Sequence, residues 1–246
     1  MFREDFDGDE LDRSIWLPHY LPAWSSKEAT KAEYHLHDST LELTIPPGHL
    51  RWCEDEHPEP LRVSGVQSGN FSGPVGSPTG QQRFRDGLLV REEQDRFEGW
   101  LPSSGRVAVR CRMSLSPRSM AAMWLAGFEE RPEDGGELCV VEVFGRSIRD
   151  GSAEVGIGVK QVNDPRLTHD FVAPRLAIDV ADYHTYEVQW DDARAAFLVD
   201  GAQAHICSNP PTYPMQVMVA VFDFPGWSGR DDHVPSLTVD WVEGST

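Results

Sequence analysis

Two glutamates in the stretch GGELCVVEVF, residues 135–144, have the type and spacing that best suit catalysis in this chain. Glu137 and Glu142 stand among Leu, Cys and Val, in an apolar run that indicates a buried strand. Carboxylates are rarely buried without a partner or a function. Two carboxyls roughly 5–5.5 Å apart can cleave a glycosidic bond with retention, one as nucleophile and the other as acid and then base.

The spacing of the pair requires an irregular strand if both carboxyls are to act together. On a regular strand side chains alternate, so Glu137 and Glu142 would point to opposite faces. A β-bulge adds one residue and returns Glu142 to the face of Glu137, and bulges are common beside active sites. A second interpretation stays open from the spacing alone: the strand is regular, Glu142 faces solvent and Glu137 caps a turn.

The strands that must position this pair are indicated by apolar and polar residues that alternate with period two. Such runs occur at 40–45, 106–115, 184–190, 195–200, 215–222 and 236–242. Asp200-Gly201 is a typical tight-hairpin pair. Pro, Gly and Ser accumulate between 46 and 105, which predicts long binding loops across one face. We therefore expect an all-β, two-sheet antiparallel sandwich, with residues 1–246 in a single domain.

Composition narrows the class of partner. The chain carries 22 Lys and Arg against 40 Asp and Glu, a formal net charge of −18, which disfavours nucleic acid and anionic membrane surfaces. It contains no apolar run long enough to span a membrane. The charged start MFREDFDGDELD is unlike an export signal, so the expected location is cytoplasmic, or secreted if a signal was trimmed. The four cysteines are widely spaced and are predicted to be mostly reduced thiols.

Several segments resemble glycoside hydrolase family 16. GGELCVVE resembles the bulged signature Glu-x-Asp-x-x-Glu, and further matches follow in family order at 2–16, 120–137, 183–201, 210–224 and 237–244. The resemblance, to the laminarinase- and agarase-like branch, implies a concanavalin A-like jelly roll with a cleft across its concave face. It implies a retaining endo-hydrolase of β-linked glucan or galactan, which we expect to be a monomer. Glu137 falls on the nucleophile and Glu142 on the acid/base.

Cys139 departs from the family pattern, which has an Asp that hydrogen-bonds to the nucleophile at this position. A thiol is a weak donor without charge. The second hypothesis is therefore a carbohydrate-binding protein on the same fold with weak or lost catalysis, and a third is an inherited fold with a non-sugar partner. Two neighbouring carboxylates should raise the pKa of Cys139, which favours a small hydrophobic filler over a reactive thiol.

Aromatic side chains are expected to bind the sugar, because sugar rings stack their apolar faces on them. Trp124 or Met123 should face the cleft from the strand beside the catalytic one, although core packing of Trp124 stays open. Trp100 and Trp227 lie in loop-like segments and are predicted to form subsite walls.

No cofactor is predicted to be required. The nine histidines include one HxH pair, His35 and His37, and form no HExxH arrangement, which argues against a catalytic transition metal of the HExxH type. The resemblance implies a possible structural calcium with Asp240 as a ligand, and solvent exposure of Asp240 is the alternative. It also implies a cleft histidine in many relatives on the strand after the motif, where this chain has Val159 or Lys160.

Overall fold

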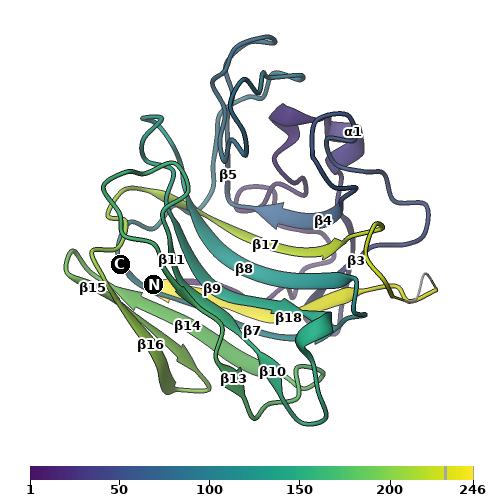
Figure 1. Ribbon diagram of the computed structural model, residues 1–246, viewed down its shortest axis with the longest axis vertical. Coiled ribbons are helices and arrows are strands. Elements are labelled where there is room, and N and C mark those ends of the chain that lie inside the picture. Colours follow the sequence, from purple (N-terminus) through teal and green to yellow (C-terminus); the bar gives the residue numbers. More distant parts are fainter. Residues whose placement is uncertain (230–231, 246) are drawn as a thin grey trace.

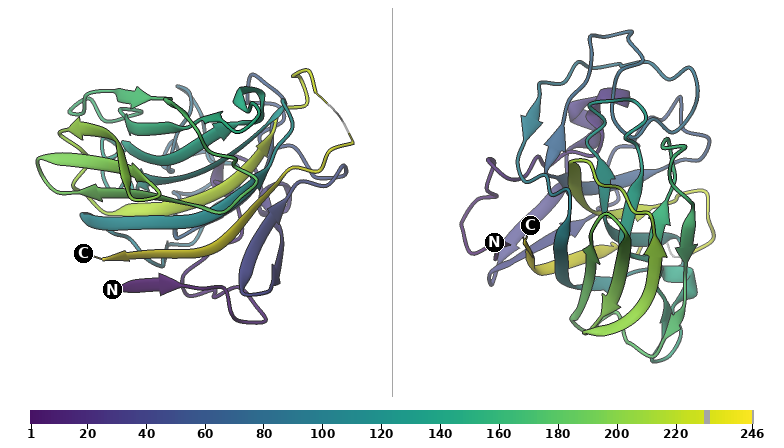
Figure 2. Two further views of the ribbon diagram at one scale, coloured as in Figure 1. Left: turned by 90° about the horizontal axis from the view of Figure 1, so that it is seen from below. Right: turned by 90° about the vertical axis from the view of Figure 1, so that its left-hand side faces the viewer.

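Two curved antiparallel sheets lie face to face in the computed structural model, which describes residues 1–229 and 232–245 (Figure 2). The predicted fold class, an all-β two-sheet sandwich, is confirmed. All the predicted strand runs lie in these sheets, and the Asp200-Gly201 hairpin is present with both residues at positive φ, 49° and 76°.

The sheet that carries no catalytic candidate is called the outer sheet. Both ends of the chain enter it, because β1 pairs with β18. Its strands, in spatial order, are β16 (Ala202–Ser208), β15 (Arg194–Val199), β14 (His184–Trp190), β7 (Gly105–Ser114), β18 (Ser236–Ser245), β3 (Thr40–Thr44) and β2 (Glu33–His37), with β1 (Phe2–Glu4) beside β18.

The second sheet holds the two glutamates and is called the site sheet. Its strands, in spatial order, are β12 (Asp170–Val172), β11 (Gly156–Lys160), β9 (Glu137–Phe144), β8 (Ser119–Gly127), β17 (Met215–Asp223) and β4 (Arg62–Gln67). Short pairs join β5 (Gly69–Asn70) to β6 (Phe97–Glu98) and β10 (Ala153–Glu154) to β13 (Arg175–Leu176). The central strands β8 and β17 are buried along their whole length.

Side chains from the facing sides of both sheets fill one large core. Residues such as Val109 and Val188 of the outer sheet pack against Leu125, Val143 and Val219 of the site sheet. Burial of alternate residues on each strand drives this packing, because every buried aliphatic side chain contributes about 1.5–3 kcal/mol. The core therefore fixes which side chains of β9 point away from it.

A second apolar cluster lies on the opposite face of the site sheet, beneath the long loops. The loops between 46 and 105 gather at the β4 end of that sheet, next to α1 (Lys27–Thr30) (Figure 1). Trp24 of the 3₁₀ turn Pro22–Trp24 and Trp52 pack there with Met218 and Phe222. A further 3₁₀ turn, Gly145–Ser147, follows β9. Among the described residues, no helix has the length and apolarity to cross a membrane.

Candidate active site

Strand β9 contains the predicted bulge. Against β8, Val141 pairs with Met123 and Cys139 pairs with Trp124, so Val140 is the additional residue without a partner. The pairing of β9 with β11 shifts at the same level. The bulge interpretation of the glutamate spacing is therefore confirmed, and the regular strand is excluded.

The bulge sorts the side chains of β9 into two sets. Leu138, Val140, Val141 and Val143 lie in the core between the sheets. Glu137, Cys139, Glu142 and Phe144 line one pocket on the other face of the site sheet. Both glutamates are partly buried there, and Glu142 has room because Gly156 stands opposite it: a Cβ on Gly156 would meet the Glu142 Cβ at 3.1 Å.

Lys160 supplies the cation beside the pair. It stands opposite Glu137 in the register of β11 and β9, and its Nζ lies 2.7 Å from Oε2 of Glu142. The ring of Phe171 lies 4.5 Å from the same ammonium. Among the described residues, the Glu137 carboxyl makes no hydrogen bond or ion pair. The two carboxyls therefore differ in environment, one paired with a cation and the other not.

The electrostatics of the pocket follow from burial and these neighbours. Burial raises the pKa of Glu137 to about 7, Lys160 opposes the shift, and the negative charge of Glu142 adds to it. Burial alone would lower the pKa of Lys160, but the negative groups around it raise that pKa above its usual value. Glu137 is thus the carboxyl of the pair that can retain a proton near neutral pH.

Cys139 does not replace the family Asp as a partner of Glu137. Its Sγ donates to the carbonyl oxygen of Gly156 at 3.6 Å. Burial, helped by the adjacent carboxylates, raises the pKa of the thiol well above its usual value. Cys139 is therefore a neutral thiol, as the sequence predicts.

The pocket has a volume of about 270 Å³, and its walls come from strands β8, β9, β11 and β17 and from the loops beside them. Besides the β9 and β11 residues, it is lined by Tyr20, His57, Leu61, Met120, Ala122, Trp124, Phe222 and Phe224. This mixture of aromatic faces and a few charged groups is typical of sites for sugars and other small polar ligands. The sequence offered Val159 or Lys160 at the place where many relatives carry a cleft histidine, and the structure shows that Lys160 lines the pocket. No local sequence pattern marked Tyr20, His57 or the three Phe residues as pocket residues.

Of the two β8 candidates, only Trp124 reaches the pocket. Trp124 contacts the rings of Tyr20 and Phe222, with centroids 6.3 and 6.0 Å away. Met123 is 1% exposed and lies in the core between the sheets. Neighbours on a regular strand face opposite sides, so placing Trp124 in the pocket turns Met123 away from it. The prediction for Met123 is wrong.

The two loop tryptophans have different surroundings from those predicted. Trp100 stacks on Phe2 at 3.9 Å, packed against the core beside the two chain ends, so it forms no wall of the pocket. Trp227 stacks on the pocket residue Phe224 at 4.2 Å, while the Arg146 guanidinium lies 4.1 Å from its ring. Trp227 therefore does not line the pocket itself but packs against two residues that do, Phe224 and Phe144.

Asp240 does not fit a calcium site. It lies at the register shift of β18 and forms an ion pair with Arg110 on β7. A guanidinium at the carboxylate repels a second cation, and calcium needs six to eight oxygen ligands. The calcium prediction stays untested, and the Arg110 contact argues against Asp240 as its ligand.

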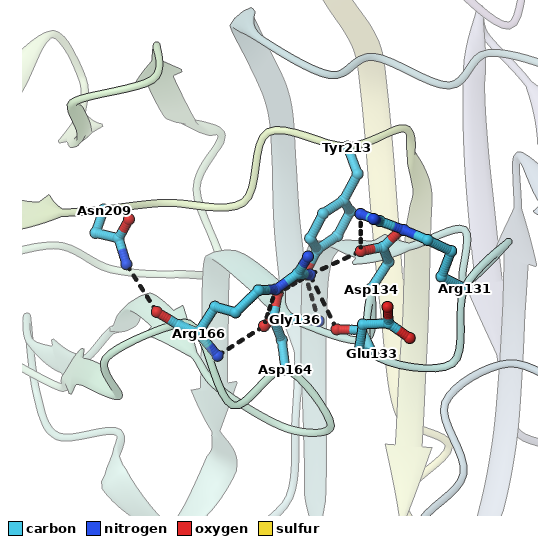
Figure 3. Close-up of polar contacts among 8 residues, drawn as sticks. All are labelled: Arg131, Glu133, Asp134, Gly136, Asp164, Arg166, Asn209 and Tyr213. Atoms are coloured by element: carbon cyan, nitrogen blue, oxygen red, sulfur yellow. Dashed lines mark hydrogen bonds and ion pairs between the residues drawn. The ribbon is translucent and has the colours of Figure 1, made fainter.

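A polar network fixes the chain just before Glu137 (Figure 3). The Gly136 N–H donates to the Tyr213 hydroxyl at 2.7 Å, and that hydroxyl donates to Asp164 at 3.0 Å. Arg166 forms ion pairs with both Asp164 and Asp134, each at 2.7 Å. These charge-assisted bonds are strong because both partners are ionised and the two carboxylates are buried. The start of β9, and hence the backbone of Glu137, is held from three loops.

Comparisons with known proteins identify a family and solved structures that are similar to this chain. The family described as "Glycosyl hydrolases family 16" matches residues 103–243, more than half of the chain, including the whole of β9. No curated protein sequence matches the chain.

Solved structures share the fold over nearly all of the chain at low sequence identity. A GlcNAcα1-4Gal-releasing endo-β-galactosidase from Clostridium perfringens has a TM-score of 0.80 and 20% identity, covering 99% of this chain and 62% of that one. The chain therefore spans less than two thirds of that protein. A laminarinase from Flavobacterium sp. UMI-01 has a TM-score of 0.65 and 16% identity, covering 100% and 99%. A laminarinase catalytic domain from Thermotoga petrophila RKU-1 has a TM-score of 0.67 and 13% identity, and the match covers 99% of this chain and 96% of that one.

Proposed function

Since this chain belongs to glycosyl hydrolase family 16, we propose that it cleaves a β-linked polysaccharide, a β-glucan or β-galactan, internally and with retention. The observation that carries the proposal is the bulge at Val140, which brings Glu137 and Glu142 to one pocket. The bulge also supports placement in the laminarinase- and agarase-like branch. Structural neighbours include laminarinases and an endo-β-galactosidase, which is why both sugar classes are retained.

The proposed reaction is a double displacement. Glu137 attacks the anomeric carbon while Glu142 protonates the leaving oxygen, which breaks the glycosidic bond and forms an ester to Glu137. Glu142 then takes a proton from water as the water attacks the ester and releases the sugar. Trp124 and the Phe rings of the pocket offer apolar faces to the sugar.

The proton must change place for these roles. In the free protein the raised pKa of Glu137 favours its protonated form, and Glu142 forms the ion pair with Lys160. The reaction needs Glu137 as a carboxylate and Glu142 as an acid, so a proton must pass to Glu142, away from its contact with Lys160, as the sugar binds. Reversed roles, with Glu142 as nucleophile, are the direct alternative.

A second function, carbohydrate binding with weak catalysis, is favoured by one observation. Cys139 contacts Gly156 and not Glu137, so Glu137 lacks the hydrogen bond that the family Asp provides. Under this function, sugars would bind in the same pocket while turnover stayed slow.

The two functions separate in one experiment. Release of reducing ends from laminarin, lichenan, agarose and carrageenan is measured together with calorimetric binding, for the wild type, Glu137→Gln and the exposed control Glu133→Gln. If the protein is a hydrolase, the wild type and Glu133→Gln turn over at least one polymer. In Glu137→Gln the rate falls at least a thousandfold while the polymer still binds. Binding without turnover in all three proteins supports the carbohydrate-binding function. If the proteins neither bind nor cleave any of the polymers, both functions are rejected for these polymers.

A further inference from the structure

Three side chains of metal-binding type meet where the edges of the two sheets come together. Asp170 lies on β12 at the edge of the site sheet, and His205 and Cys207 lie on β16 at the edge of the outer sheet. One ligand atom from each, a carboxylate oxygen, a ring nitrogen and a sulfur, lies within 4.8 Å of the other two. The cluster has no part in the reaction proposed for Glu137 and Glu142.

Strand β16 turns both of its ligands inward. His205 pairs with Phe197 and Cys207 pairs with Ala195, and both partners are buried in the core. Residues paired across neighbouring strands share a face, so His205 and Cys207 point toward the other sheet. Ile206, between them, is 44% exposed on the outside.

Asp170 reaches this place because β12 approaches β11 closely. A Cβ on Gly158 would meet the Asp170 carbonyl oxygen at 2.2 Å, and Gly158 has a φ of +133°, so only glycine fits there. His205 Nε2 lies 2.8 Å from Asp170 Oδ1, and the Cys207 thiol donates to the Asp170 carbonyl at 3.2 Å. The backbone thus brings all three groups together without a metal.

We propose that Asp170, His205 and Cys207 bind one Zn²⁺ ion, with water as the fourth ligand. Zinc takes these three ligand types at about 2.0–2.3 Å in a tetrahedron, which separates ligand atoms by roughly 3.5 Å. The three ligand atoms lie between 2.8 Å, the distance from His205 Nε2 to Asp170 Oδ1, and 4.8 Å from one another, a range that includes 3.5 Å. As the Zn–S bond forms, the Cys207 thiol releases its proton to water. The ion has access, because the side chains of Asp170 and His205 are 37% and 21% exposed.

Such an ion would clamp the edge of one sheet to the edge of the other. It would also restrain Phe171, the neighbour of Asp170, which contacts the Lys160 ammonium in the pocket. The expected effect is on thermal stability more than on turnover, because no ligand lines the pocket.

The test uses the whole protein, freed of metal with a chelator. Zn²⁺ is titrated by calorimetry and Co²⁺ by absorption, since only a thiolate ligand gives a sulfur-to-cobalt charge-transfer band. We expect one equivalent of either metal, the band in the wild type, and a rise in melting temperature with Zn²⁺. Cys207→Ser should abolish the band, and His205→Ala should weaken Zn²⁺ binding roughly tenfold or more.

Two matched controls separate the site from adventitious binding. Cys53→Ser, another buried thiol, and His35→Ala, an exposed histidine, should retain the band and the affinity. Stoichiometric Co²⁺ without the band in the wild type would overturn the proposal, whether or not the variants fold. Unchanged Zn²⁺ affinity in a folded Cys207→Ser would overturn it as well.

Discussion

The ammonium of Lys160 lies 2.7 Å from Oε2 of Glu142, on a strand whose register places Lys160 opposite Glu137. The cation therefore lies beside both carboxyls of the pair. Where the family keeps a third acid, this chain has the neutral Cys139, so one cation and two carboxyls share the pocket. Lys160 thus acts electrostatically on Glu137 while it forms an ion pair with Glu142.

Removing this cation should shift the pH dependence of the reaction. Lys160→Met is expected to raise the pKa of Glu137 further, because Lys160 lowers it, and to move the limb of the kcat/KM profile that Glu137 controls up by about one pH unit. The exposed Lys31→Met is the control, with an unchanged profile expected. Coincident profiles for wild type and Lys160→Met would show that the ion pair has no such role.

Restoring the family acid should change turnover. Cys139→Asp is expected to raise kcat about tenfold or more, since an Asp can hydrogen-bond to Glu137. It should also lower the melting temperature, because the site is buried and an additional carboxyl is costly there. Cys139→Ser, polar but uncharged, is the comparison. If Cys139→Asp folds but turns over no faster than Cys139→Ser, the missing Asp is not what limits this protein.

Glu137 should leave a signature in the pH dependence of stability. Its pKa is about 7 in the folded protein against 4.5 as the usual value, so between these values the folded state holds a proton that the unfolded chain has released. This stabilisation is full below pH 4.5 and is lost as pH rises through 7, a change of roughly 3 kcal/mol.

Urea unfolding at several pH values checks this sign. The free energy of unfolding should change less with pH in Glu137→Gln than in the wild type between pH 4.5 and 7. Glu129, whose pKa burial raises to about 8, contributes in the same direction and is present in both proteins. Parallel curves for the two proteins would contradict the buried, unpaired state of Glu137.

The network before β9 should support both stability and turnover. Tyr213→Phe removes the acceptor of the Gly136 N–H and the donor to buried Asp164, at a cost of about 1–3 kcal/mol. Tyr183→Phe is the matched control, because the Tyr183 hydroxyl makes no hydrogen bond among the described residues. Equal stability and equal kcat in the two variants would mean that the network does not hold Glu137.

The sequence predicts what depends on local pattern. Alternation within 184–190 is enough to define β14 with the observed bounds, since a strand with one buried face repeats every second residue. The five-residue spacing of Glu137 and Glu142 leaves both a regular and a bulged strand open, and the resemblance of GGELCVVE to the family signature is what predicts the bulge that the structure contains.

Contacts between distant segments give no such pattern. Tyr20 and His57 reach the pocket from loops far from β9 in the chain. Trp100 lies in a loop-like segment, and its sequence neighbours do not show that Phe2 of β1 stacks on its ring. The His205–Cys207 pair is neither HxH nor CxxC, and its third partner, Asp170, comes from the other sheet.

The most direct test of the central claim is covalent trapping of the nucleophile. The protein is incubated with a 2-deoxy-2-fluoro glycoside of the polymer class that it hydrolyses, and the labelled peptide is mapped by mass spectrometry. We predict an ester on Glu137, with no label in Glu137→Gln and faster accumulation in Glu142→Gln when the leaving group needs no acid. A label on Glu142 would contradict the assigned roles, and the absence of any label from a protein that hydrolyses the polymer would contradict double displacement itself.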